Sequence, residues 1–374
     1  MSSSVGDLLF VVAILVTIFI HEAAHFGFAK LFRIKVQEFF VGFGPRIWSF
    51  RRGDTEYGVK ALPLGGYVRI AGMNPFQETP PEEFPRTFPA KPIWQRAIVI
   101  VTGPVTHFVM ALLLLVVFFV AIGVLTPAKP VVEGVRSTLE GQPSPASVAG
   151  LRPGDQVVAL DGQPVGSTDR FLTFTRSHAG REISITVLRH GKRVTLRVTP
   201  APVTVDGKRV GQLGIFVGEG RQKYNPVVAT GKAFVATGQS VKEVVLALGK
   251  IFGPSGLRRI GDLLAGTRPR QTTDVTSVVG ATRLAGEAVR AGAWDALFSL
   301  LITFNIFVGI LNLVPLPPPD GGHLAVLVYE KIRRRRPDLR KLVPLTAAVA
   351  GFIVLLAVSQ IYIDITNPIP NPFR

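Results

Sequence analysis

Two histidines and a glutamate follow the first long apolar run of the chain. The run Leu8 to Ile20 reads LLFVVAILVTIFI, and residues 21–25 read HEAAH. Because His21 and His25 are four residues apart, a helix places both on one face. Two imidazoles at this spacing bind zinc, and Glu22 can take a proton from a water on the metal. The pattern therefore predicts a hydrolytic zinc site.

The position of this motif beside a lipid-compatible run strengthens the prediction. Each ionisable side chain inside a membrane span costs about 2.5 to 3.5 kcal/mol on insertion scales, so such side chains usually serve a function. The alternative is that HEAAH lies just beyond the membrane, as the polar end of a helix. The sequence favours the metal site and leaves this alternative open.

A catalytic zinc needs a third protein ligand, and Asp320 is the clearest candidate. It stands in NLVPLPPPDGGH, residues 312–323, where four of the five residues 315–319 are proline. Prolines cannot continue a helix, and irregular backbone at membrane depth is tolerated only where protein buries it or water reaches it. Asp320 could instead cap the following helix. Combined with HEAAH, it becomes the predicted third ligand.

Two further polar residues lie close to Asp320 in the sequence. His323 could support or replace a ligand, although polarity at a helix end is the commoner explanation. Asn312 could hold a substrate backbone or stabilise an oxyanion. A hydrogen bond between helices would explain Asn312 equally well.

The composition indicates a membrane protein with a soluble part. Of 374 residues, 47% are hydrophobic and 18% are charged, and the net charge is +17. The basic clusters flank apolar segments, which favours roles in topology and lipid contact over nucleic-acid binding. The chain has no cysteine, which excludes disulfides, thiolate ligands and a cysteine nucleophile.

Four apolar segments are long enough to cross a bilayer, which takes about 20 residues. They are roughly residues 7–29, 97–124, 296–316 and 342–363. Basic residues gather in the short loops after the first and third segments, which predicts that both loops face the cytoplasm. Both termini and the long segment between the second and third spans then lie outside.

The long segment is expected to hold an inserted α+β domain at residues 126–218. Its β-branched runs GDQVVALDGQPV and ISITVLRHGKRVTLRVTP contain Asp-Gly and His-Gly turns. Residues 219–295 are predicted as a linker with amphipathic helices. Within this linker, the Gly- and Arg-rich residues 253–271 are expected to form a loop. Residues 1–125 and 296–374 would form the two halves of the membrane core.

In this order, the motifs resemble those of the site-2 protease family. HEAAH and NLVPLPPPDGGH accompany VGFGP, TEYGVKALPLGGYVRIAGM, KPIWQRAIVIVTGPVTHFVMA and the PDZ-like SPASVAGLRPGDQVVALDGQPV. Within the family, the chain is most similar to the bacterial regulator-of-sigma-E type, in a shorter form with one PDZ domain. The resemblance covers almost the whole chain.

The resemblance implies a zinc endopeptidase that cuts the transmembrane segments of single-span proteins. It implies Zn²⁺ as cofactor, with ligands His21, His25 and Asp320, and Glu22 as general base. A strand or hairpin at the membrane surface would pair with the unwound substrate. The residues that it implies in substrate binding are Asn312, Leu64, Gly65, Gly66 and Pro317.

The resemblance also implies partners and a location. Substrates would be anti-sigma factors or remnant signal peptides, already trimmed by another protease. The protein would lie in the bacterial cytoplasmic membrane in contact with lipid, with its PDZ domain outside. That domain could bind a newly made C-terminus or exclude bulky substrates. We expect a size filter, because the sequence shows no clear carboxylate loop.

The chain departs from the family pattern at three places, and rival functions remain. Pro319 replaces the usual Leu, His107 stands where Asn is usual after Gly-Pro, and two alanines fill the centre of HEAAH. One rival is an inactive membrane scaffold, against which the intact motif argues. The other is a zinc or proton transporter, which would need more ionisable residues in the spans.

Overall fold

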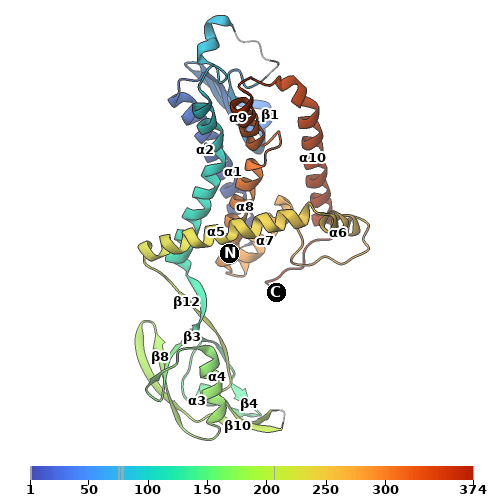
Figure 1. The fold of residues 1–374 in the computed structure, drawn as a ribbon. Coiled ribbons are helices and arrows are strands. Elements are labelled where there is room, and N and C mark those ends of the chain that lie inside the picture. Colours follow the sequence, from blue (N-terminus) through green and yellow to red (C-terminus); the bar gives the residue numbers. More distant parts are fainter. Residues whose placement is uncertain (1, 75, 77–79, 206, 374) are drawn as a thin grey trace. The chain divides into compact units, whose positions relative to one another are not determined.

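The chain folds into two compact units in the computed structural model (Figure 1). The first unit comprises residues 1–118 and 227–374, and the second comprises residues 119–226. The predicted domain 126–218 lies within the second unit, whereas most of the predicted linker belongs to the first. The structure describes residues 2–74, 76, 80–205 and 207–373, and of Ser3, Pro63 and Leu64 it describes the backbone alone.

Long apolar helices dominate the first unit. They are α1 (Ser3–Leu31), α2 (Ile93–Val117), α8 (Trp294–Leu313) and α10 (Val343–Thr366). With adjoining short helices they form four stretches long and apolar enough to cross a membrane, which confirms the four predicted spans. The third stretch ends at Leu313, three residues earlier than predicted, because residue 314 precedes a proline and takes an extended conformation.

Close helix packing builds the core of this unit. Helix α2 contacts α1 and α8, and α1 also contacts α7 (Val278–Arg290). A cluster of buried apolar side chains joins α1, α7 and α8, including Phe10, Val289 and Leu297. Many other apolar side chains of the spans are exposed, as expected where lipid is the solvent.

The helices between the inserted unit and α8 agree only in part with the sequence. The predicted linker helices are present as α5 (Pro226–Ile251) and α7, and α6 (Pro254–Leu264) lies between them. The loop predicted for 253–271 is therefore wrong over the length of α6. Pro254 stands at the start of this helix, where its missing N–H costs nothing. Leu257, Ile260 and Leu263 then recur at helical spacing.

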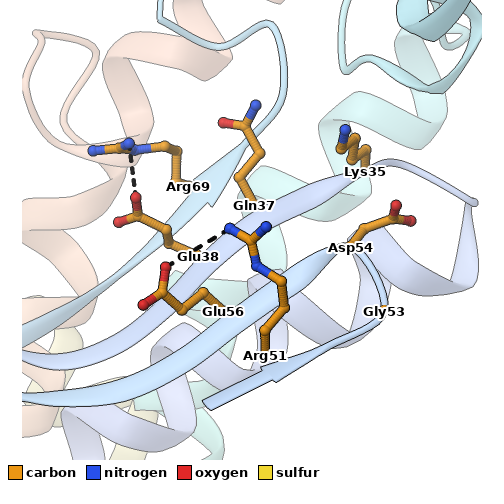
Figure 2. A pocket seen from close by; sticks show the side chains of 8 residues that line it. All are labelled: Lys35, Gln37, Glu38, Arg51, Gly53, Asp54, Glu56 and Arg69. Carbon is orange, nitrogen blue, oxygen red and sulfur yellow. Dashed lines mark ion pairs between the residues drawn. The ribbon is translucent and has the colours of Figure 1, made fainter. Parts of the chain in front are cut away.

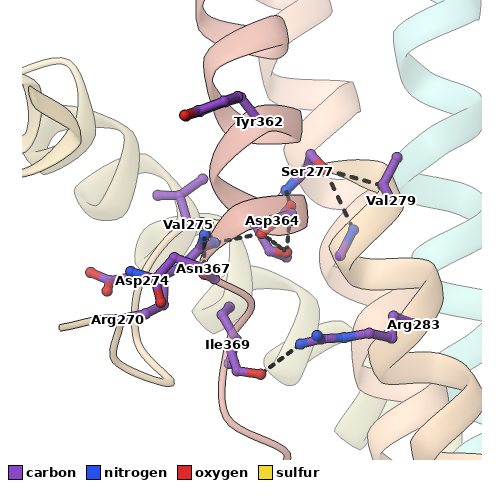
Figure 3. A network of polar contacts seen from close by, with 12 residues as sticks. Arg270, Asp274, Val275, Ser277, Val279, Arg283, Tyr362, Asp364, Asn367 and Ile369 are labelled. Carbon is purple, nitrogen blue, oxygen red and sulfur yellow. Dashed lines mark hydrogen bonds and ion pairs between the residues drawn. The ribbon is translucent and has the colours of Figure 1, made fainter. Parts of the chain in front are cut away.

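A buried polar network ties the last turn of α10 to the loop before α7 (Figure 3). Asp364 accepts hydrogen bonds from Arg270 at 2.6 Å and from the backbone N–H of Ser277 at 2.6 Å. The Thr276 hydroxyl adds contacts to both carboxylate oxygens. Arg270 also donates to the carbonyls of Val275 and Asn367. This network anchors one end of the fourth span.

The segment between α1 and α2 is a strongly bent hairpin of β1 (Val36–Arg52) and β2 (Thr55–Ile70). The bends divide the two strands into four hydrogen-bonded runs. The runs lie side by side in the order 66–70, 36–41, 56–59 and 48–51, and each run pairs with the next. Residues 66–70 therefore form an edge, since in the described structure only one side of this run is paired.

The inserted unit holds a larger sheet in the order β12-β3-β6-β8-β9. Phe171 of α4 packs into its core with Val157, Ile183 and Ile185. The predicted His-Gly turn joins β8 to β9, and both of its residues have positive φ, as a two-residue hairpin requires. These elements are β3 (Val124–Val135), β6 (Gln156–Leu160), α4 (Thr168–Ser177), β8 (Ile183–Arg189), β9 (Lys192–Val198) and β12 (Ile215–Gln222).

Shorter elements complete both units. Helix α9 (Asp320–Arg333) follows the proline-rich bend after α8. The others are a 3-10 helix Pro81–Arg86, a π-helix Phe118–Ile122, β4 (Thr138–Leu139), β5 (Gln142–Pro143), α3 (Pro145–Val148), β7 (Gln163–Pro164), β10 (Ala201–Val205), β11 (Lys208–Gln212) and a 3-10 helix Leu339–Leu342.

Candidate metal centre

Helices α1 and α9 bring three predicted ligand residues together. His21 and His25 lie one turn apart on α1, and both are buried. Their Nε2 atoms are 3.1 Å apart. Oδ2 of Asp320, the first residue of α9, lies 3.3 Å from each of these nitrogens. Residues almost 300 positions apart in the sequence therefore converge on one point.

The spacing of these atoms fits a tetrahedral metal ion. Zinc bonds of about 2.0 to 2.1 Å place neighbouring ligand atoms about 3.3 Å apart, close to the observed 3.1 and 3.3 Å. Oδ2 of Asp320 is buried, and no described donor makes a hydrogen bond to it. Such an atom normally indicates an unrecorded partner, and a cation would supply it. Three protein ligands would leave a fourth position open for chemistry.

Two glycines allow Asp320 to reach this point. The chain leaves α8 at Leu313 and turns through the prolines before α9 begins. A Cβ on Gly321 would lie 2.2 Å from the carbonyl oxygen of Val314. A Cβ on Gly322 would lie 2.5 Å from the backbone nitrogen of Pro317. The bend therefore packs directly on the start of α9, which any larger residue would prevent.

Helix α2 covers the two histidines, a contribution that the sequence did not predict. A Cβ on Gly103 would lie 2.2 Å from Nε2 of His25 and 2.7 Å from Cε1 of His21. The carbonyl of Val99, one turn earlier, accepts a 2.7 Å hydrogen bond from Nδ1 of His25. That bond leaves Nε2 of His25 free to bind a metal. The only signal in the sequence was the Gly-Pro pair inside an apolar helix.

The edge run of the sheet passes beside Glu22. A Cβ on Gly66 would lie 3.2 Å from Cγ of Glu22 and 3.0 Å from the carbonyl oxygen of Phe40. The Glu22 carboxyl group also faces the backbone amide of Val68. The predicted base and the predicted strand residue Gly66 are thus neighbours, whereas a Cβ on Gly65 would meet Phe43. The side chain of Leu64 lies outside the described residues.

The remaining predicted residues lie near the site without joining the ligand cluster. Asn312 is half-buried in the last turn of α8, and Pro317 is half-buried in the bend that follows. His323 is half-buried in the first turn of α9, and burial lowers its pKa. Among the described residues, the ligand cluster contains His21, His25 and Asp320 but not His323. The alternative that His323 replaces a ligand therefore gains no support.

Two buried residues next to the cluster had no predicted role. His107 of α2 is almost fully buried, and its ring centre lies 5.0 Å from that of His21. Its Nδ1 lies 3.4 Å from Oδ1 of Asn305 on α8. The sequence marked His107 only as a departure from the family pattern. Nothing in the sequence singled out Asn305, because its partner lies on another helix.

A polar cavity of about 370 Å³ on the sheet is a rival site (Figure 2). Its charged side chains are paired, four of them with one another and Lys35 and Asp54 with residues outside the cavity. Arg69 contacts Glu38 at 2.8 Å, and Arg51 contacts Glu56 at 3.9 Å. Side chains that already neutralise each other offer little to a ligand. The ligand cluster on α1 and α9 therefore remains the better candidate.

Comparisons with known proteins identify the family of the chain. The model of "Peptidase family M50" matches residues 9–358. The chain is 35% identical to zinc metalloprotease Rip1 of Mycobacterium tuberculosis, over 97% of this chain and 98% of that protein. It is 30% identical to metalloprotease MmpA of Caulobacter vibrioides, over 88% and 87% of the two chains.

A solved PDZ domain of an SdrC-like protein from Listeria monocytogenes also matches, over 25% of this chain and 92% of that one. The identity is 20% and the TM-score is 0.21. The family model and the relatives both cover nearly the full length, including both halves of the ligand cluster. The chain therefore belongs to peptidase family M50, the site-2 proteases, and is a membrane zinc metalloendopeptidase.

Proposed function

We propose that this protein hydrolyses peptide bonds within the transmembrane segments of single-span proteins, with zinc held by His21, His25 and Asp320. The observation that carries the proposal is the convergence of three ligand atoms, two of them on α1, which is long and apolar enough to cross a membrane. A site in that position meets substrates that are themselves in the bilayer. Soluble proteins would have no route to it except as unfolded segments.

Zinc, when bound, supplies a Lewis acid that polarises a carbonyl group and lowers the pKa of water. The protein's own residues supply the rest. Glu22 accepts a proton from the attacking water and returns it to the leaving amine. The Val99 carbonyl orients His25, and the missing side chain at Gly103 leaves room above both imidazoles.

The edge run 66–70 would hold the substrate. A helix must unwind before its peptide bonds can be attacked, and an extended segment can add to a free sheet edge. This edge is unpaired in the described structure and passes beside Glu22. An added strand would thereby carry its carbonyl groups past the base. We place Asn312 and Pro317 at the same substrate path, as the family resemblance implies.

The substrate class and the orientation extend this proposal. Anti-sigma factors and remnant signal peptides are single-span or single-helix substrates of suitable size. The basic loops after the first and third spans favour a cytoplasmic position for the sheet. The inserted unit would then lie outside the bacterial cytoplasmic membrane. The family resemblance supports the substrate class, and the basic loops support the orientation.

A groove in the inserted unit suggests that this unit binds peptides. A cavity of about 320 Å³ lies between α4 and β12, with Arg136 and Arg176 among its lining residues. Strand β12 is an edge of the sheet, and the buried hydroxyl of Thr175 in the groove has no described partner. These features favour capture of a peptide C-terminus over a pure size filter.

Peptide binding to the full-length protein in detergent separates these two alternatives. A peptide with a free C-terminal carboxylate should bind more tightly than its amidated form. If neither form binds, the size filter is the better explanation.

Cleavage of a single-span anti-sigma model substrate tests the main proposal. The purified protein is compared with Glu22→Gln, and zinc is measured in both. We expect zinc in both proteins and cleavage only by the wild type, because the ligands remain when the base is lost. Absence of zinc from the wild type, or cleavage that survives the substitution, would favour the inactive scaffold or a different mechanism.

A further inference from the structure

The two histidines of HEAAH differ in what holds them. His25 donates from Nδ1 to the Val99 carbonyl at 2.7 Å, so its tautomer and ring orientation are set. Nδ1 of His21 is buried and has no hydrogen-bond partner among the described residues. If Nε2 of His21 binds zinc, Nδ1 carries the proton and needs an acceptor. A neighbouring side chain can supply one.

His107 is the residue that can supply this acceptor. The side-chain amide of Asn305 donates through Nδ2 to the Leu301 carbonyl at 2.9 Å. That bond assigns the other amide atom, Oδ1, as the acceptor that faces Nδ1 of His107 at 3.4 Å. Nδ1 of His107 must then be the protonated nitrogen. Its Nε2 is left with a free lone pair, which is an acceptor.

We propose that His107 is a positioning residue that accepts a hydrogen bond from Nδ1–H of His21 and holds that ligand for zinc. The complete relay runs from His21 through His107 and Asn305 to the Leu301 carbonyl of α8. It gives His21 the same kind of support that Val99 gives His25. This inference rests on the proposed zinc site, and its experiment is designed so that the two can fail separately.

The positions of the rings allow this bond. An N–H···N bond of about 2.9 to 3.0 Å between two imidazole edges places the ring centres about 5 Å apart, and the observed separation is 5.0 Å. The inclination of 45° between the rings is compatible with such a bond. The described structure does not form it, so the bond needs a rotation of the His107 ring. The χ2 torsion of histidine is broad, and the long contact to Asn305 leaves it freedom to rotate.

The packing around His107 argues against a simple space-filling role. A Cβ on Gly309 would lie 3.1 Å from Cβ of His107, so α2 and α8 approach closely here. An apolar side chain would fill this interior without leaving any polar group to satisfy. A buried imidazole that faces a fixed amide on one side and a ligand histidine on the other has two polar partners instead. Its position therefore serves the metal site.

Zinc affinity of three variants tests the inference. His107→Leu removes the acceptor, and His107→Gln restores one, because a glutamine oxygen reaches about as far as Nε2. Loss of an outer partner of a ligand histidine typically weakens metal binding about 10- to 100-fold. We expect that loss for His107→Leu and a change of only a few-fold for His107→Gln. Thr346→Val is the matched control, since that hydroxyl donates to the carbonyl of Leu342 at the start of its own helix, α10, away from the ligand cluster.

The measurements are chelator competition for zinc and the visible absorption spectrum of the cobalt-substituted protein. Neither depends on turnover. Equal zinc affinity and equal spectra in wild type and His107→Leu would overturn the inference, as would equal losses in the Leu and Gln variants. Should His107→Leu fail to fold, Asn305→Ala provides the second test, with a weaker loss expected. A wild type that binds no zinc would instead defeat the proposed site itself.

Discussion

Asp320 begins α9 and Asp364 lies in the last turn of α10, yet their carboxylates have different surroundings. Both oxygens of Asp364 accept hydrogen bonds, from Arg270, Thr276 and the backbone of Ser277 (Figure 3). Oδ2 of Asp320 faces two imidazole nitrogens and receives no hydrogen bond in the described structure. The carboxylate of Asp364 therefore has its hydrogen bonds without any ligand, whereas that of Asp320 has an oxygen without one.

This difference separates a structural cluster from a functional one. Buried polar groups are normally paired, so a satisfied group contributes to the fold. A group left unsatisfied between potential metal ligands points to a partner that the chain does not encode. Within HEAAH, the Val99 carbonyl is the outer partner of His25, and His107 is the proposed outer partner of His21. Substitutions at the two aspartates should therefore affect different properties.

The largest effect is expected at Asp320. Asp320→Asn removes the charged ligand, so zinc should be lost and cleavage should fall to background. The zinc-free variant should be close in stability to zinc-free wild type, because Oδ2 of Asp320 has no hydrogen-bond donor in the described structure. Zinc analysis and thermal unfolding after chelation measure both properties. A variant that kept zinc and activity would remove Asp320 from the ligand set.

Gly103→Ala should disturb the same ligand cluster from helix α2, which covers the two histidines. The new Cβ would lie 2.2 Å from Nε2 of His25, so the ligand or the helix must move. We expect at least about a tenfold loss in zinc affinity and activity. Gly27→Ala on α1 is the matched control, since nothing lies within 4 Å of its Cβ. Chelator competition on both variants decides whether close approach at Gly103 matters.

Asp364→Ala should affect stability and leave chemistry unchanged. Removal of one partner from a buried ion pair costs about 3 to 5 kcal/mol in unfolding free energy, because the other charge is left uncompensated. Zinc content and the activity of the folded fraction should match the wild type. Unfolding in detergent by denaturant measures the loss. The double variant Arg270→Met with Asp364→Leu should recover part of it.

A third buried aspartate, in the inserted unit, gives the smallest expected effect. Burial alone would raise the pKa of Asp155, but hydrogen bonds from Arg189 and from the backbone N–H of Arg152 hold it below its usual value. A lowered pKa in the folded state means that the carboxylate stabilises the unit above about pH 4. That contribution should be lost as the pH falls further.

Thermal unfolding as a function of pH tests this expectation in the full chain. The transition of the inserted unit should move to lower temperature below about pH 4, and Asp155→Asn should reduce that dependence. A pH profile that is the same in both proteins would show that Asp155 contributes nothing to it.

The sequence alone was sufficient for the elements that depend on local pattern. Long apolar runs predicted the four spans, because lipid demands about 20 apolar residues wherever the chain crosses. The spacing of His21 and His25 predicted a shared helix face, and the prolines before Asp320 predicted the end of a helix. Helix α6 was not predicted, because its glycines and arginines are typical of a loop and its apolar face is short.

Only the tertiary structure decided which distant residues meet. Asp320 reaches the two histidines because α9 starts beside α1, and no local pattern encodes that approach. Gly103, His107 and Asn305 matter through the helices that face them, so their types alone carried almost no signal. Side-chain chemistry is local and can be read from the sequence. Whether a polar side chain finds its hydrogen-bond or metal partners depends on residues that packing brings from elsewhere in the chain.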